Sequence, residues 1–375
     1  MIIGLPKETL KGETRIALLP SDIKRAVSDK LSFQVETGAG IGAYFSDDMY
    51  LESGAEVITN VYLSANLIIR INPPSENEID MLKEGSCLVS LINPFINHSL
   101  VEKLAERNIS TFCLELIPRS TYAQSMDVLS SQATVSGYRA VLNAATHMGK
   151  FFPMLMTPAG TIKPAHVLIL GAGVAGLQAI ATARRLGAKV EAFDVRPAAR
   201  EQVESLGAKF LYMDLDDSAE TDSGYAVEMN EEFIRKEMEL LHDAAKRVDG
   251  IITTALIFGK KAPVLIKDYM VKDMQTGSCI IDLAAENGGN CELTEPGDII
   301  NHNGVTIDGR LNLPSQVPYH ASQMLSKNMA KLLSEIISEG KIQFDMENEI
   351  VKGCLLTHDG KITHEMTRNI IEGAT

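Results

Sequence analysis

Short apolar runs alternate with amphipathic stretches along the first third of the chain. Between these runs, residues 99–107 carry Leu100, Val101, Leu104 and Ala105 on one face of a predicted helix. Strands that alternate with helices predict parallel pairing, with helices on both faces of a sheet. The runs that predict strands are residues 2–5, 33–36, 67–71, 87–92 and 110–115.

The same alternation is more regular in the rest of the chain. A helix that follows the first strand there extends to Leu186, and a second helix covers residues 198–206. Gly187 and Gly207 end these helices, because glycine readily adopts the backbone conformation that closes a helix. The pattern therefore predicts a second α/β domain. Its predicted strands are residues 167–170, 190–193, 209–213, 250–254, 279–283 and 305–308.

Long helical stretches indicate how the domains are divided. Residues 127–150 contain no proline for about six turns, which suits a helix that bridges two domains. The last long helix, about residues 321–339, is expected to pack back on the first domain, and residues 357–375 are expected to form a polar tail. The expected division is residues 1–129 plus 320–375 for the first domain and residues 130–319 for the second, joined by long helices with a cleft between.

The composition excludes several classes of protein. The 375 residues are 45% hydrophobic and 22% charged, which is typical of globular proteins and excludes wholesale disorder. The formal net charge of −14 argues against nucleic acid as the main partner, because phosphate binding needs clustered Lys and Arg. Residues 165–183 lack Asp, Glu, Lys and Arg, but Gly171, Gly173 and Gly176 divide them into a strand and a helix start, so no membrane span is predicted.

The cysteines indicate a reducing compartment. Their number is odd, their spacing is irregular and no CxxC pair occurs, which fits free and mostly buried thiols and gives no structural zinc signature. The eight histidines show no ligand spacing, so no metal site is predicted. The N-terminus has the features of neither a signal peptide nor a transit peptide. The cysteines are Cys87, Cys113, Cys279, Cys291 and Cys354.

One acidic segment interrupts the alternation of strands and helices. Residues 214–232 contain eight acidic residues and no basic one. A loop of this length within a compact domain is uncommon and is often a lid or a functional insertion. A solvated acidic loop is the other interpretation, and the sequence alone does not decide between them.

A glycine-rich fingerprint is the strongest functional motif. The GxGxxG at Gly171–Gly176 follows a strand and opens a helix, and a second strand ends before Asp194, eighteen residues beyond Gly176. The helix N-terminus favours phosphate groups, and the Asp194 carboxylate would accept bonds from the adenosine ribose, so NAD(H) is favoured over NADP(H). The pattern predicts Rossmann-like domains. The predicted cofactor-binding residues here are Gly171, Ala172, Gly173, Val174, Ala175, Gly176, Asp194, Val195 and Arg196.

A dense polar cluster precedes the bridging helix. Residues 118–132 supply a cation, an amide, a carboxylate and several hydroxyls within a dozen or so positions. Such groups would suit contacts with a nicotinamide. A hydrogen-bonded interdomain loop with helix caps is the alternative.

Five long segments carry a resemblance to a known family: PRSTYAQSMDVLSSQ, LGAGVAGLQAIATARRLGAKVEAFDVRP, SGYAVEM, VDGIITTALIFGKKAPVLI and IIDLAAENGGNCELTEPGD. They resemble the soluble NAD(H)-binding component of proton-translocating nicotinamide nucleotide transhydrogenase, over about residues 1–353. The resemblance implies hydride transfer between NADH held here and NADP⁺ held on a partner component, and a membrane component that couples transfer to proton movement. It also implies a homodimer, peripheral at the cytoplasmic side of the membrane or at the mitochondrial matrix side.

The resemblance also assigns residues. Arg119, Gln124, Asp127 and Ser130 match the family's loop at the nicotinamide and its ribose, and Asp194 matches its ribose carboxylate. Nucleotide-to-nucleotide hydride transfer needs positioning and no general acid or base, so these four residues would orient the substrate.

The resemblance gives the acidic segment a role as well. Tyr225 matches the tyrosine of a loop that folds over bound nucleotide in the family, with Gly224 as a hinge. This favours the lid interpretation. At Tyr122, where relatives carry a basic residue, the sequence departs from the family pattern.

Two alternatives remain open. An NAD-dependent alanine dehydrogenase has a similar N-terminus, including Arg15, which would bind a substrate carboxylate, and its acidic position falls on Glu286. Its proton chemistry needs a lysine and a histidine, however, and the matching stretches here, residues 70–74 and 90–93, contain neither. A regulatory subunit that binds NAD without turnover is the second alternative.

Overall fold

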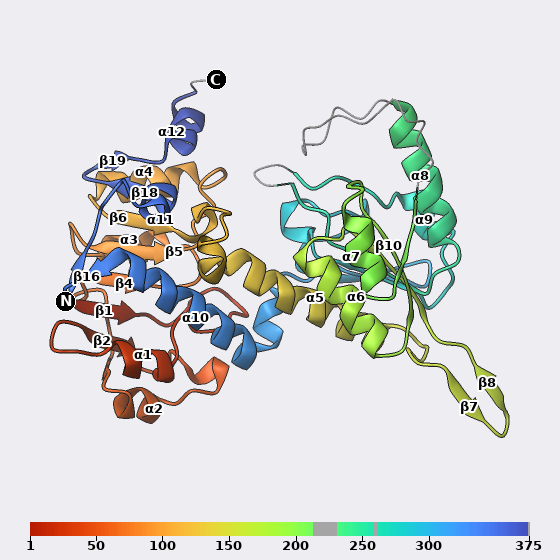
Figure 1. The fold of residues 1–375 in the computed structure, drawn as a ribbon, viewed down its shortest axis with the longest axis horizontal. Helices are drawn as coiled ribbons and strands as arrows, with labels where there is room; N and C mark the ends of the chain where they lie inside the picture. The colour runs from red at the N-terminus through yellow and green to blue at the C-terminus, as the bar shows by residue number, and fades with distance from the viewer. Residues whose placement is uncertain (213–230, 258–260, 374–375) are drawn as a thin grey trace. The chain divides into compact units, whose positions relative to one another are not determined.

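The computed structural model describes residues 1–212, 231–257 and 261–373. Contacts divide the chain into two compact units, which we call unit 1 (Met1–Gln132 with Pro314–Thr375) and unit 2 (Ala133–Leu313). The sequence pattern predicted these divisions at residues 129/130 and 319/320. The two units are distinguished by colour along the chain in Figure 1.

Unit 1 contains an eight-stranded sheet in the order β19-β18-β6-β5-β4-β1-β2-β3. The pairs from β6 to β3 are parallel, as predicted, whereas β18 pairs antiparallel with β6 and β19 with β18. All five strands predicted for this region are present, and β3 was not predicted. The strands are β1 (Ile2–Leu5), β2 (Ser32–Glu36), β3 (Glu56–Ile58), β4 (Leu67–Ile69), β5 (Cys87–Ser90), β6 (Ser110–Cys113), β18 (Leu355–His358) and β19 (Lys361–Ile362).

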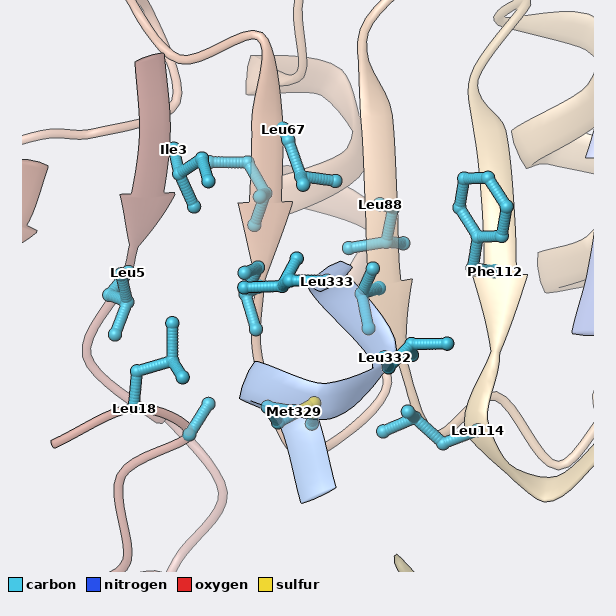
Figure 2. Packing of buried hydrophobic residues seen from close by; sticks show 14 of the residues in the cluster. Ile3, Leu5, Leu18, Leu67, Leu88, Phe112, Leu114, Met329, Leu332 and Leu333 are labelled. Atoms are coloured by element: carbon cyan, nitrogen blue, oxygen red, sulfur yellow. The ribbon is translucent and has the colours of Figure 1, made fainter. Parts of the chain in front are cut away.

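The long helix α10 (Pro318–Ile336) packs on the sheet of unit 1. In Figure 2, Met329, Leu332 and Leu333 of α10 point toward the strands, and all belong to one core cluster with Ile3 and Leu67. The expectation that the last long helix returns to the first domain is confirmed. The other helices of unit 1 are α1 (Pro20–Ala26), α2 (Asp47–Glu52), α3 (Glu76–Met81), α4 (His98–Glu106), α11 (Glu349–Cys354) and α12 (Glu365–Glu372), and a small hairpin pairs β16 (Ile337–Ser338) with β17 (Lys341–Ile342).

The prediction of a polar tail at residues 357–375 is wrong. This stretch contributes to β18, β19 and α12, and the edge of the sheet depends on it. Leu355 and Leu356 are buried, and the buried Thr357 hydroxyl donates to the Ile109 carbonyl at 2.7 Å. A satisfied polar side chain can therefore lie in a core strand, which hydrophobic patterning does not detect.

Unit 2 contains a seven-stranded sheet in the order β11-β10-β9-β12-β13-β15-β14. All its pairs are parallel except β14 with β15, whose two-residue turn, Asn303-Gly304, has positive φ at both positions. The six predicted strands are present. The strands are β9 (His166–Leu170), β10 (Lys189–Phe193), β11 (Lys209–Phe210), β12 (Gly250–Thr253), β13 (Cys279–Asp282), β14 (Ile299–His302) and β15 (Val305–Asp308).

Helices cover both faces of this sheet. Val167 and Ile169 of β9 pack in a cluster with α5 and α6, whereas Leu168 and Leu170 pack in a second cluster with α8 and α9. Strands buried on both faces read as continuous apolar runs, which explains their clear signal. The helices are α5 (Val128–His147), α6 (Val174–Arg185), α7 (Ala199–Ser205), α8 (Glu231–Ala245) and α9 (Asp268–Lys272), and a separate hairpin pairs β7 (Leu155–Thr157) with β8 (Gly160–Ile162).

The apolar stretch at residues 165–183 is divided as predicted. Strand β9 ends at Leu170 and helix α6 begins at Val174. Among the described residues, no helix is both long enough and apolar enough to cross a bilayer.

All five cysteines are buried and unpaired, as predicted. Burial raises the pKa of the Cys87, Cys279 and Cys354 thiols to about 12. Such thiols are packing groups rather than nucleophiles, because the thiolate is the reactive form.

Candidate functional site

The glycine fingerprint forms a tight turn between β9 and α6. Gly171 has φ of +96°, and a Cβ at this position would lie 2.5 Å from Thr254 Oγ1. A Cβ on Gly176 would lie 1.8 Å from the Gly171 carbonyl oxygen, so only glycine permits this packing of helix against turn. A Cβ on Gly173 would meet nothing within 4 Å. The first and third glycines thus serve the turn, and the second faces open space where a phosphate can approach.

Asp194 lies directly beside this turn. Its carboxylate accepts the Ala172 backbone N–H at 2.7 Å and two guanidinium bonds from Arg196 at 2.9 Å each. Burial alone would raise the pKa of Asp194, but the bonds from Arg196 and Ala172 hold it below its ordinary value. Asp194 is therefore a carboxylate at neutral pH, and the neighbouring Val195 is 43% exposed. Residues of the fingerprint and of the β10 end come together, as the motif requires.

The predicted nicotinamide loop lies in unit 1. Gln124 belongs to a short 3₁₀ turn, Ala123–Met126, and is exposed, as is Arg119. Asp127 caps helix α5, since its Oδ1 accepts the Ser130 N–H at 2.9 Å and its Oδ2 accepts the Ser130 hydroxyl at 2.6 Å. The helix cap considered in the sequence analysis is therefore present. A cap leaves room for a second role, because both residues are only half-buried.

The predicted site residues thus form two groups. Arg119, Gln124, Asp127 and Ser130 belong to unit 1, and the fingerprint with Asp194 belongs to unit 2. Tyr225 and Gly224, with residues 214–230 of the acidic segment, lie outside the described residues.

Arg15 already holds a carboxylate of its own chain. Its Nε and one terminal nitrogen donate to the two oxygens of Glu13 at 2.8 and 2.6 Å, and its other terminal nitrogen donates to Gln132 at 2.8 Å. Asn72 donates to Glu13 at 3.0 Å, and Arg70, which is 1% exposed, forms ion pairs with Glu8 and Glu78. Arg15 and the strand end at residues 70–74, which an alanine dehydrogenase would use for substrate chemistry, therefore take part in an internal network here.

The Arg15–Glu13 pair predicts acid-sensitive stability. Burial alone would raise the pKa of Glu13, but Arg15, Asn72 and Ser315 lower it to about 2. A depressed carboxyl pKa stabilises the fold above the ordinary value near 4.5, and this contribution is lost as pH falls toward 2. Glu13→Gln should cost about 2 kcal/mol at pH 7 and progressively less below pH ~4.5. Urea unfolding of both proteins across pH measures this difference, and a difference that does not depend on pH would contradict it.

A buried polar cluster at the end of β13 was not predicted from the sequence. The Asp282 carboxylate is 1% exposed and accepts hydroxyl bonds from Thr253 at 2.8 Å and Thr294 at 2.6 Å. It also accepts backbone N–H bonds from residues 284, 290 and 291. The available signal was an Asp at the end of an apolar run, followed by Gly288-Gly289. In the described part of the chain, no group of three or more His, Cys, Asp or Glu side chains could hold a metal ion.

Comparison with known proteins identifies the family. The models for the alanine dehydrogenase/PNT N-terminal and C-terminal domains match residues 4–136 and 140–365. The chain belongs to the alanine dehydrogenase/PNT family. An NAD(P) transhydrogenase subunit alpha chain of Rhodospirillum rubrum is 45% identical, over 97% of this chain and 98% of that protein. A crystal structure of transhydrogenase from Sinorhizobium meliloti matches with a TM-score of 0.86 and 39% identity, covering 98% of this chain and 100% of that one.

Similarity within this oxidoreductase family is graded. An alanine dehydrogenase of Methanococcus maripaludis is 27% identical, over 97% of this chain and 95% of that protein. The transhydrogenase subunit is therefore the nearer of these two relatives, in agreement with the resemblance found in the sequence. The two Rossmann-like domains of the alanine dehydrogenase/PNT chain are those predicted from the alternation of strands and helices.

Proposed function

We propose that this alanine dehydrogenase/PNT chain is the NAD(H)-binding component of a proton-translocating transhydrogenase. The observation that carries the proposal is the fingerprint turn with Asp194 beside it, in a chain 45% identical to a transhydrogenase alpha subunit. These residues fit NAD(H): Gly173 is open to a pyrophosphate, and Asp194 is ionised to accept ribose hydroxyls. NADP(H) binds to a partner component, and a membrane component couples the transfer to proton movement.

The chain's own residues supply orientation. NADH, when bound, supplies the hydride, and the acceptor is NADP⁺ on the partner. Such a transfer requires two carbon atoms at about 3–3.5 Å in a dry setting, and it needs no general acid or base. Arg119, Gln124, Asp127 and Ser130 orient the nicotinamide and its ribose. Tyr225 of the acidic segment closes over the bound nucleotide.

The decisive experiment measures hydride transfer from NADH to an NADP⁺ analogue, with and without an NADP-binding transhydrogenase component. Transfer that depends on the partner supports the proposal. Pyruvate with ammonium, and L-alanine with NAD⁺, are run in parallel. NADH oxidation by pyruvate and ammonium without the partner would overturn the proposal in favour of an alanine dehydrogenase, although the commitment of Arg15 to Glu13 weighs against that. NADH binding with no transfer would favour the regulatory subunit, and the absence of Trp keeps the fluorescence background low.

Asp194 predicts the nucleotide preference. Asp194→Ala removes the ribose acceptor and the charge that repels a 2′-phosphate, and it releases the Arg196 guanidinium. NADH affinity should fall about tenfold, and the preference over NADPH should narrow. Fluorescence titrations with both nucleotides measure this. Glu204→Ala is the control, since Glu204 is a carboxylate of unit 2 paired with Arg200. An unchanged preference in the Asp194 variant would refute the assignment.

An apolar hairpin supports the homodimer. Hairpin β7–β8 extends away from the sheet of unit 2 in Figure 1. Phe151, Met154 and Met156 at its base and first strand are 56%, 56% and 78% exposed. Exposed apolar side chains of this size favour burial against a second copy. The solution mass measured by light scattering tests the dimer, and a Met156→Asp variant should shift it toward the monomer. The dimer is proposed to lie at the cytoplasmic face of the membrane through its partner components, or at the matrix face in a mitochondrion.

A further inference from the structure

A single buried side chain ties together two stretches of backbone near the end of β12. Asn290 is fully buried, and its Oδ1 accepts the Ala255 N–H at 3.0 Å. Its Nδ2 donates to the carbonyl oxygens of Ala255 at 2.9 Å and Pro263 at 2.8 Å. One group therefore provides an acceptor and two donors, all to backbone, which only a carboxamide side chain can do at this site.

The position of Asn290 is itself fixed from the neighbouring strand. Its backbone N–H donates to Asp282 Oδ2 at 2.8 Å, and its carbonyl accepts the N–H groups of Leu265 and Ile266 at 2.8 and 3.0 Å. The buried Asp282 cluster thus holds Asn290, and Asn290 holds Ala255. A buried network in which each polar group has its partners is rigid.

Ala255 lies next to the fingerprint turn. The preceding residue, Thr254, donates its hydroxyl to the carbonyl oxygens of Leu170 and Gly171, at 3.2 and 3.1 Å. The following residues, Leu256 and Ile257, are 54% and 48% exposed. Asn290 therefore sets the backbone that presents two apolar side chains beside the turn.

The sheet order tells which half of a dinucleotide this segment faces. Strands β10 and β12 lie on opposite sides of β9, and a ligand of such a sheet binds at the carboxyl ends where the strand order reverses. Asp194, at the end of β10, takes the adenosine half. The other half then extends across β9 toward the end of β12, where Leu256 and Ile257 lie.

We propose that Asn290 is a positioning residue for the nicotinamide half of NAD(H), acting through the backbone of Ala255. This inference rests on the proposed function, since it requires the chain to bind NAD(H). Asn290 touches no substrate atom itself. Its carboxamide fixes the segment whose apolar side chains pack against the nicotinamide and exclude water from it.

The test compares two ligands that share the adenosine half. Asn290→Ala should weaken NADH binding about tenfold and leave ADP binding within about twofold of the wild type, since supporting contacts of this kind change affinity by roughly 10–100-fold. NADH is titrated by fluorescence and ADP by calorimetry. Asn301→Ala is a matched control, because Asn301 accepts a turn N–H from Gly304 in the β14–β15 hairpin at 3.1 Å. It should change neither affinity.

Each outcome decides the inference. Equal losses of NADH and ADP affinity would show a general structural role and overturn it, as would unchanged affinities for both. If Asn290→Ala fails to fold, Leu256→Ala serves instead, because Leu256 is half-exposed and its loss spares the network. Leu256→Ala should weaken NADH binding about threefold, with ADP binding unchanged, and unchanged NADH binding would overturn the inference. A wild type that binds ADP but not NADH would overturn the proposed function as well.

Discussion

Replacing Gly176 with alanine should abolish detectable NADH binding and destabilise unit 2. The new Cβ would lie 1.8 Å from the Gly171 carbonyl oxygen and 2.8 Å from its carbon, both backbone atoms that no rotamer change can move. Gly171 itself is held at φ of +96° against Thr254. Relief therefore requires α6 to move away from the turn, and its N-terminal N–H groups leave the phosphate position. Overpacking of this kind costs about 3 kcal/mol or more.

Two further glycines separate packing from ligand approach. Gly149→Ala introduces a Cβ with nothing within 4 Å and should leave stability and NADH affinity unchanged. Gly173→Ala also has open space, so it should fold normally, but its methyl group occupies the room of the phosphate and should lower NADH affinity. Urea unfolding and NADH titration of the three variants measure both quantities. NADH affinity near the wild-type value in the Gly176 variant would show that the dinucleotide does not use this turn.

The sequence predicted the fully buried strands best. The apolar run at residues 2–5 matches β1 (Ile2–Leu5) residue for residue, because parallel strands buried on both faces contain few polar positions. Edge strands were missed for the converse reason. In β14 the exposed positions alternate with positions that are only half-buried, and its clearest signal, the Asn303-Gly304 turn, lies outside the strand.

The candidate site was predictable where its residues are adjacent along the chain. The fingerprint and Asp194 follow from one strand–turn–helix–strand pattern, and the structure adds only that Arg196 pairs with Asp194. The Asp282 cluster could not be found in this way. Its hydrogen-bond donors come from Thr253 on a neighbouring strand and from residues 284–294, and no spacing rule connects them before the sheet has formed.

Replacing Asp127 with asparagine should lower the rate of hydride transfer about a hundredfold, because misplacing a reacting group by about 1 Å has an effect of this size. Asparagine keeps an oxygen to accept the Ser130 N–H, so the cap of α5 survives with little loss of stability. The charge is lost, together with the acceptor for the Ser130 hydroxyl. Transfer measured with the partner component under saturating NADH isolates this effect from binding.

The alternative, that Asp127 serves only as a helix cap, makes the opposite prediction. Asp127→Asn would then transfer hydride at nearly the wild-type rate, and only Asp127→Ala would be impaired, with about 1 kcal/mol of stability lost. Ser46→Ala is the matched control, because Ser46 caps α2 in the same unit through its bond from Met49, away from the loop. It should lose stability and keep the transfer rate. Since asparagine and aspartate are equivalent as caps but differ in charge, the Asp127→Asn rate alone decides whether the carboxylate orients the nucleotide.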